Sequence, residues 1–361
     1  MCAITLSVKT GSKTIKRKQE KKPMIKKLYT VAAICAGVSL AQSVSAATLL
    51  NPSGTVALGV NPEGHLNAPD PDGFAINSSL LGVTSIGLGD ATSPGCFCEG
   101  WGVSANGTDS GYANVDIDGI VNLTVDSFVT DDAGLADGLG GTFATSAVSL
   151  TSMPGLKVTQ SYAASAGAPG ALFEDKVTIE NTTGAALTDV KYVRVMDWDV
   201  PPTEFFEFVT IAGTATTTDL EESDNNGFSS ADPLAAVFSF GLNTVDFVDA
   251  GPSDHGAYFR FNFGGLADGE TKEFSIFYGA AADEAAALAA LGAVGAELFS
   301  LGQSTTLAGG PNNDGTTFIF GFKGVGGIII VPPPGVPDAG STFGLLGMAL
   351  AGLVGFARSR K

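Results

Sequence analysis

Positive charge is the scarcest property of this sequence once its two ends are set aside. Nine of the 19 Lys and Arg residues precede Ala47 and three lie among the last four residues. Residues 47–335 therefore carry seven Lys and Arg against 35 Asp and Glu, a net charge of about −28. Such a surface repels the phosphates of nucleic acids and of anionic lipids, so we expect no nucleic-acid partner. It suits divalent cations or simple solvation.

Residues and motifs typical of catalysis are also scarce. The sequence has only two histidines, His65 and His255, and it lacks a G-x-S-x-G elbow, an H-E-x-x-H helix and a P-loop. Ser253-Asp254-His255 contains the three residue types of a catalytic triad, but within one turn they cannot adopt the triad geometry. We expect that the protein is not an enzyme.

Cysteine is limited to four residues, of which Cys2 and Cys35 precede Ala47. Cys96 and Cys98 are separated by one residue, which allows only a small, strained disulfide ring. The sequence leaves three interpretations open for this pair: a local disulfide, two metal ligands whose partners lie elsewhere, or an intermolecular bond or free thiols.

The N-terminal segment has the pattern of a secretory signal. Lys26 and Lys27 precede an apolar run at 28–40, and Val44-Ser45-Ala46 ends in small residues. We interpret residues 1–46 as a signal peptide that signal peptidase removes after Ala46. Translation starts either at Met1 or at Met24, which begins a more typical signal.

The C-terminal segment, residues 336–361, has three parts in a fixed order. A motif of small residues is followed by an uncharged apolar run at 343–357 and by a basic end, Arg358-Ser-Arg-Lys361. The run is short for a spanning helix, but the basic end is typical of the cytoplasmic side of a membrane. We predict a transmembrane helix at 343–357. The motif residues are Val336, Pro337, Asp338, Ala339 and Gly340.

This tail resembles the PEP-CTERM class of bacterial sorting tails, in the variant whose motif reads Val-Pro-Asp-Ser-Gly, with Ala339 in place of Ser. The resemblance covers the tail only. It implies recognition by an exosortase, which cuts near the motif and releases or attaches the ectodomain outside the cell. It therefore implies export to the surface, outer envelope or extracellular matrix of a Gram-negative-type bacterium, with membrane contact through the tail before processing.

Between the two ends, residues 47–323 alternate apolar and polar side chains in many short runs. We predict an all-β ectodomain, an antiparallel β-sandwich of one domain or two sub-domains. Two hairpins are expected, one across Asp118-Gly119 and one joining 173–179 to 187–195. Further strands are expected at 205–211, 236–240, 257–263, 273–278 and 317–322.

One segment has a helical pattern. Residues 283–301 are rich in Ala and Leu, acidic residues Asp283 and Glu284 stand at the start, and Gly302 is placed as a stop. We predict a single helix over 283–301. Residues 324–335, which end in three prolines and Gly335, are predicted to form a linker in extended polyproline geometry.

Two acidic segments of the sequence have the composition of a ligand site. Asp219, Glu221, Glu222 and Asp224 place hard oxygen ligands in what we expect to be a loop, which suits Ca²⁺ or else plain solvation. A calcium loop beginning at Asn114 is rejected, because its twelfth position is Val125 instead of Glu.

The segment Met196-Asp-Trp-Asp199 allows two interpretations. Asp197 and Asp199 would project from one face of a strand end and Trp198 from the other. Paired carboxylates beside an aromatic ring are used by glycosidases and sugar-binding grooves. Alternatively, the segment is a strand end turned by the following prolines, with Trp198 in the core.

Together these observations predict an exported surface or matrix protein with a structural or adhesive role, whose partners are extracellular polysaccharide or other surface proteins. A carbohydrate-binding module is the first alternative, and exposed Trp or Tyr on a flat sheet face would favour it. A polysaccharide-acting enzyme is the second, and it would need two carboxylates from separate strands facing one groove. Ca²⁺ is the only cofactor considered.

Overall fold

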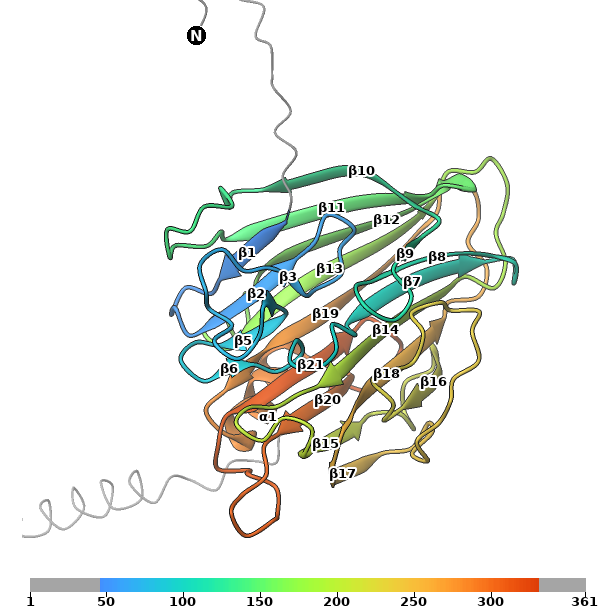
Figure 1. The fold of residues 1–361 in the computed structure, drawn as a ribbon. Helices are drawn as coiled ribbons and strands as arrows, with labels where there is room; N and C mark the ends of the chain where they lie inside the picture. The colour runs from blue at the N-terminus through green and yellow to red at the C-terminus, as the bar shows by residue number, and fades with distance from the viewer. Residues whose placement is uncertain (1–45, 331–361) are drawn as a thin grey trace, which may run out of the picture. The chain divides into compact units, whose positions relative to one another are not determined.

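The computed structural model describes residues 46–330 (Figure 1). Predictions for the signal peptide through residue 45, the prolines of the linker, the sorting motif and the apolar run 343–357 lie outside the described residues. Within the described part, no helix is both long and apolar enough to cross a membrane.

The described residues form 21 strands and one helix. In chain order these are β1 Ala47–Leu50, β2 Val56–Val60, β3 Ala68–Pro69, β4 Leu80–Leu81, β5 Val83–Ser85, β6 Gly89–Asp90, β7 Gly100–Ala105, β8 Asp109–Asn114, β9 Ile120–Val121, β10 Leu123–Thr130, β11 Phe143–Leu150, β12 Met153–Ala164, β13 Leu172–Asn181, β14 Lys191–Trp198, β15 Glu207–Ala212, β16 Leu220–Asp224, β17 Phe247–Ser253, β18 His255–Asn262, β19 Thr271–Ala281, α1 Glu284–Val294, β20 Leu298–Gln303 and β21 Thr317–Lys323.

The strands pair antiparallel into four sheets, none of which closes on itself. The largest has nine strands in the order β10-β11-β12-β13-β19-β21-β20-β15-β17, and the next has six in the order β16-β18-β14-β7-β8-β9. Smaller sheets have the orders β1-β2-β5-β6 and β3-β4. The predicted all-β class with one helix is confirmed, while the sandwich arrangement stays a prediction.

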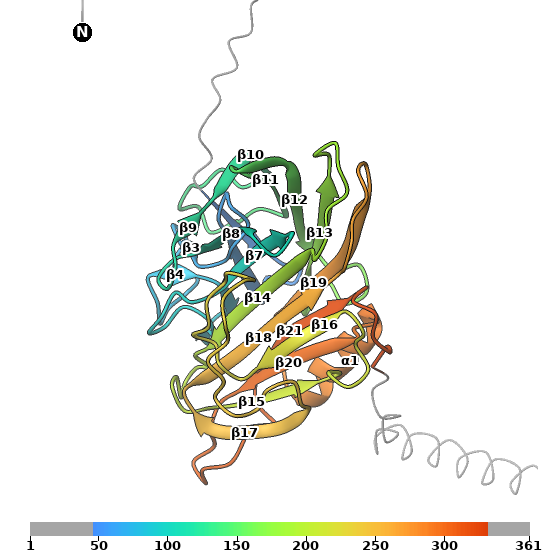
Figure 2. The same ribbon diagram turned by 90° about the vertical axis from the view of Figure 1, so that its right-hand side faces the viewer.

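One hydrophobic core includes side chains from the three larger sheets. Figure 2 shows β14 and β18 of the six-stranded sheet close to β19 and β21 of the nine-stranded sheet. Aromatic rings of the two sheets are in contact: the ring centroid of Phe259 lies 5.0 Å from that of Phe322, and the centroid of Tyr192 lies 5.0 Å from that of Phe274. Alternate residues of β19 and β21 face away from this core, and Phe277 of β19 packs with helix α1 instead. The nine-stranded sheet is therefore apolar on both faces where α1 covers β19, β20 and β21.

The helix is shorter than the sequence predicts. Asp283 caps its start, because Asp283 Oδ1 accepts a hydrogen bond from Ala286 N at 2.7 Å. Gly295, with φ 72°, ends the helix in the left-handed conformation. The prediction that it continues to residue 301 and stops at Gly302 is wrong, because the apolar run at 298–303 is the buried strand β20 between β15 and β21.

Of the two predicted hairpins, only the one across Asp118-Gly119 is found. There β8 pairs antiparallel with β9, and Asn114 N donates to Gly119 O at 3.1 Å. Strand β8 ends at Asn114, because Asn114 Oδ1 accepts hydrogen bonds from the N–H groups of Asp116 and Ile117 and turns the chain. The strands at 173–179 and 187–195 exist as β13 and β14, but β14 begins only at Lys191 and the two lie in different sheets. Alternation identifies a strand and its buried face, but it does not identify the partner.

The strand predicted at 236–240 is also absent. Its backbone is held by side chains instead of a ladder: Asn226 Nδ2 donates to Phe238 O at 2.6 Å, and Phe240 N donates to Asp224 Oδ1 at 3.0 Å. Val237 and Ala231 pack on Val193 and Val195, so this irregular segment covers the outer face of β14. As a result, β14 is buried on both faces.

The described part of the predicted linker contacts the domain. Val325 is buried, and the N–H groups of Val325 and Gly327 donate to Glu297 Oε2 at 2.9 and 3.0 Å. Ile330 N donates to Ala296 O at 2.8 Å. Residues 324–330 therefore pack as the edge of the domain, and extended polyproline geometry stays a prediction for the prolines beyond them.

Candidate functional site

A cluster of carboxylates lies where strand β14 ends. Asp197 is the last residue but one of β14, Asp199 follows the strand, and Asp254 stands between β17 and β18. One ligand oxygen from each of the three lies within 4.8 Å of the others. Strand β17 belongs to the nine-stranded sheet and β14 to the six-stranded sheet, so the cluster forms where the two sheets approach each other.

A fourth carboxylate, Glu207, lies beside the three. It begins strand β15, and its Oε1 accepts a hydrogen bond from His255 N at 2.9 Å. Its Oε2 is buried without a hydrogen-bond partner. The same is true of Asp197 Oδ1 and of both carboxylate oxygens of Asp199. Asp197 is 1% exposed, and Asp199 and Glu207 are 0% exposed, whereas Asp254 lies at the surface.

Three glycines bring the backbone close to these aspartates. A Cβ atom on Gly227 would stand 2.8 Å from Asp197 Oδ1, and one on Gly256 would stand 2.8 Å from the Cα of Asp197. A Cβ atom on Gly95, which has φ +77°, would lie 3.7 Å from Asp199 Oδ1. Glycine is therefore required at positions 227 and 256, because a larger side chain at either position would clash with Asp197.

The electrostatics of the cluster follow from burial and from like charges. Burial, and after it the neighbouring carboxylates of Asp197 and Glu207, raise the pKa of Asp199 to about 10. Burial likewise raises the pKa of Glu207 to about 9, and it raises the pKa of Asp197 well above its usual range, with a contribution from Asp254. No Lys or Arg of residues 46–330 forms an ion pair with any of the four.

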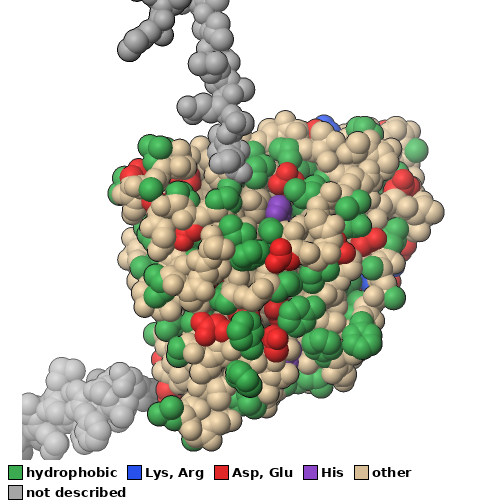
Figure 3. All heavy atoms as spheres, viewed as in Figure 1, with side chains coloured by type: hydrophobic (Ala, Val, Ile, Leu, Met, Phe, Trp, Pro, Cys, Tyr) green, Lys and Arg blue, Asp and Glu red, His purple; other side chains and the backbone are tan. Residues whose placement is uncertain are grey.

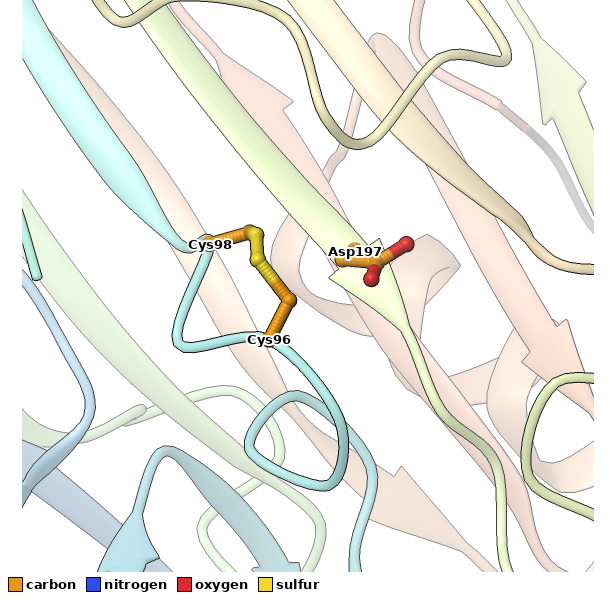
Figure 4. A group of neighbouring side chains, drawn as sticks. All are labelled: Cys96, Cys98 and Asp197. Atoms are coloured by element: carbon orange, nitrogen blue, oxygen red, sulfur yellow. A yellow bond between two sulfur atoms is a disulfide. The ribbon is translucent and has the colours of Figure 1, made fainter. Parts of the chain in front are cut away.

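The cysteine pair borders this cluster. The structure joins Cys96 and Cys98 by a disulfide bond, with the two Cα atoms 5.1 Å apart. Figure 4 shows the two sulfur atoms near Asp197 at the end of β14. The two sulfur atoms and one carboxylate oxygen of Asp197 lie within 4.8 Å of one another. The oxidation state of the pair in the exported protein stays a prediction.

A second buried polar cluster lies on the same strand. Arg194 is fully buried, its Nε donates to Glu99 Oε1, and its Nη1 donates to Gln160 Oε1 at 2.7 Å. Glu99 Oε2 accepts a further hydrogen bond from Leu66 N at 2.6 Å. The guanidinium also lies 5.3 Å from the ring centroid of Tyr278. In this cluster the buried carboxylate of Glu99 has a cation beside it.

The acidic segment predicted to bind calcium is a strand, not a loop. Strand β16 covers Leu220–Asp224, and the carboxylates around it already have partners. Asp219 pairs with Lys272 at 2.8 Å, Glu221 with Lys191 and Arg260 at 2.8 Å each, and Glu222 with Arg260 at 2.5 Å. Asp224 is buried and accepts hydrogen bonds from Asn226 N and Phe240 N. In residues 46–330 the segment contributes to no group of three metal-ligand atoms.

The interpretation of Trp198 as a core residue is confirmed. Trp198 is 0% exposed, its Nε1 donates to Ser300 Oγ at 3.0 Å, and it packs on Phe318 across the core. Trp101 is also 0% exposed. Within the described residues no Trp or Tyr is exposed at the surface. The exposed aromatic ring that would favour a carbohydrate-binding module is therefore not found among these residues.

Sequence reasoning identified Asp197 and Asp199 but missed Glu207 and Asp254 as their neighbours. Asp254 was considered only with Ser253 and His255, and Glu207 only as part of a strand. The available signal was weak: Asp254 stands between Pro252 and Gly256, and Glu207 is the one acidic residue in the segment 205–211. Their convergence depends on strand pairing across two sheets, which alternation does not reveal.

Comparison with known proteins gives one result, and it concerns the tail. Residues 335–361 match the VPDSG-CTERM motif. No curated protein matches the chain, and the ectodomain matches no family. The chain thus ends in a PEP-CTERM-like sorting tail, which points to an exported protein sorted to the cell surface.

Proposed function

We propose that the protein is delivered to the cell surface or to the extracellular matrix by an exosortase-type system, and that its ectodomain has a structural or adhesive role there. The observation that carries the proposal is the match of residues 335–361 to the VPDSG-CTERM motif. The matrix location, the Gram-negative-type envelope and the sandwich arrangement of the sheets belong to the same proposal.

The start of the fold supports removal of a signal peptide. Strand β1 begins at Ala47, which cleavage after Ala46 would make the new N-terminus. Ala47 pairs with Val60 of β2 and is 1% exposed, so the folded domain uses the chain from this residue onward. Signal peptidase and exosortase are the processing partners in this proposal.

The surface supports an adhesive or structural role. Blue side chains are nearly absent from the face shown in Figure 3, where red and green side chains intermingle. Phe238 is 77% exposed and Phe240 is 44% exposed, and their ring centroids lie 6.3 Å apart. An exposed aromatic pair on an acidic domain is suited to contacts with polysaccharide or another surface protein.

An intact-mass measurement tests the sorting part of the proposal. The protein is recovered from native cells, with cell-associated and released fractions analysed separately. We expect a chain that begins at Ala47 and ends near residues 336–340. A variant with Pro337→Ala and Asp338→Ala should keep its C-terminal tail. If Arg358–Lys361 were present in every fraction of the unmodified protein, the sorting proposal would fail and a plain membrane anchor would replace it.

A further inference from the structure

We propose that Asp197, Asp199 and Asp254, with Glu207 beside them, bind a divalent cation of the calcium type. This carboxylate cluster differs from the acidic segment at β16 that the sequence suggested. The inference does not rest on the sorting tail or on an adhesive role. It rests on oxygen atoms that the fold buries without giving them a partner.

The first argument is the unsatisfied oxygen atoms. Asp199 is 0% exposed and neither of its carboxylate oxygens has a hydrogen-bond partner; Asp197 Oδ1 and Glu207 Oε2 are also buried and unpartnered. A buried polar atom without a partner destabilises the fold, and a charged one does so more strongly. Several such atoms at one place indicate that a ligand completes the site.

The second argument is charge. The cluster gathers four acidic side chains, and none of the Lys or Arg residues within 46–330 forms an ion pair with them. All seven Lys and Arg of the ectodomain lie in this range, and four of them, at 191, 194, 260 and 272, are engaged with other carboxylates. When these carboxylates are ionised, the positive charge that compensates them therefore has to come from outside the chain.

The third argument is the spacing of the oxygens. Ca²⁺ binds oxygen ligands at about 2.3–2.6 Å, so two oxygens on one ion are at most about 5 Å apart. Ligand oxygens of Asp197, Asp199 and Asp254 lie within 4.8 Å of one another, which meets this limit. The spacing therefore allows a calcium ion, and carboxylate oxygens are the hard ligands that calcium prefers.

Access to the site is provided by Asp254. This residue is exposed and lines a surface pocket of about 590 Å³, together with Asn225, Phe240 and the segment 250–255. A hydrated ion would reach the buried aspartates past Asp254, and water in the pocket would fill the remaining coordination positions, as calcium with six to eight ligands requires.

The neighbouring cysteines determine which metal would compete with Ca²⁺ for this site. Reduced Cys96 and Cys98, with Asp197, would offer sulfur ligands, which zinc prefers. The disulfide that the structure contains removes these ligands, because a bonded sulfur is no longer a thiolate. The oxidised protein should therefore select Ca²⁺ over Zn²⁺.

Calorimetric titration and thermal unfolding test the proposal. The exported protein is purified oxidised, stripped with EDTA and titrated with CaCl₂, MgCl₂ or ZnCl₂. We expect about one Ca²⁺ per chain and, at saturating Ca²⁺, an unfolding midpoint higher by about 5 °C. Asp199→Asn should raise the Kd for Ca²⁺ by at least about tenfold. The control Asp219→Asn, which removes a surface carboxylate paired with Lys272, should keep the Kd of the unmodified protein.

A second measurement keeps the test independent of how well Asp199→Asn folds. Tb³⁺ bound to the unmodified protein should show luminescence excited through Trp198, which stands between the two aspartates in the chain, and Ca²⁺ should displace it. Calcium-independent unfolding together with no calorimetric binding would overturn the proposal. So would a response to Zn²⁺ alone, or an Asp219→Asn variant that loses Ca²⁺ while Asp199→Asn keeps it.

Discussion

Strand β14 carries two buried polar clusters, and they are built in opposite ways. At Arg194 the chain provides both members of a buried ion pair, and hydrogen bonds from Arg194 and Leu66 engage both oxygens of Glu99. Three residues later, at Asp197, the chain provides carboxylates only. Asp197, Asp199 and Glu207 are as deeply buried as Arg194 and Glu99, so the difference between these groups lies in whether the chain compensates their charge. A buried charge is stable when a partner is supplied, either by the chain or by a ligand.

The largest effect is expected at the compensated cluster. Arg194→Met should lower the free energy of unfolding by about 3–5 kcal/mol, because it leaves the Glu99 carboxylate buried without its cation. Urea unfolding at neutral pH measures the change. The double variant Arg194→Met with Glu99→Gln should recover a large part of the loss. If the double variant were as unstable as the single one, the ion pair would not be the cause.

The next effect concerns Asp175, which lies near the same guanidinium. Burial raises the pKa of Asp175 to about 7, although Arg194 lowers it. The folded state therefore holds this proton more tightly than the unfolded state, so the contribution to stability is fully present below pH 4 and is lost as the pH rises to about 7. The loss is at most about 4 kcal/mol.

Asp175→Asn should remove this dependence. Relative to the unmodified protein, the variant should gain stability between pH 4 and pH 7 and stay constant above that range. Thermal unfolding across this interval measures the difference. A variant that follows the pH profile of the unmodified protein would show that Asp175 ionises without cost, through contacts that compensate its charge.

A smaller effect, of opposite sign, is expected at the uncompensated cluster. In the presence of EDTA, Asp199→Asn should raise the free energy of unfolding by about 1–3 kcal/mol, because the fold no longer has to keep this buried carboxyl protonated beside Asp197 and Glu207. The matched change Glu99→Gln should lower it, because the buried Arg194 then loses its counter-charge. Both changes are measured by urea unfolding. If both variants changed the free energy of unfolding in the same direction, the two clusters would not differ in charge compensation.

The smallest effect is expected at the surface network beside β16. Glu221 pairs with Lys191 and Arg260 and is 31% exposed in its side chain. Glu221→Gln should lower the free energy of unfolding by about 0.2–1 kcal/mol, and high salt should reduce this difference further. The same variant should leave Ca²⁺ affinity unchanged. If Glu221→Gln clearly weakened Ca²⁺ binding, the calcium site would be the segment around Glu221 and not the carboxylate cluster at Asp197.

Local features of the fold could be predicted because they depend on neighbouring residues. Alternation identified most of the long strands, such as β18 and β21, and the acidic pair at 283–284 marked the start of α1. The end of α1 could not be predicted, because Leu298 and Leu301 fit a helical spacing as well as they fit the buried strand β20. In a strand buried on both faces the polar alternation disappears, so periodicity no longer distinguishes the two.

The chain alone determined the acidic balance, the secretory pattern before Ala47 and the sorting tail at 335–361, since each of these is read from consecutive residues. Only the tertiary structure decided which acidic residues have partners. The carboxylates near β16 meet Lys191, Arg260 and Lys272 of other strands. Asp197 and Asp199, at the end of β14, meet Asp254 between β17 and β18 and lie beside Glu207 of β15, and no Lys or Arg of residues 46–330 pairs with them. The physical reason is that charge compensation depends on distance in space, which for these groups is set by contacts between residues far apart in the chain.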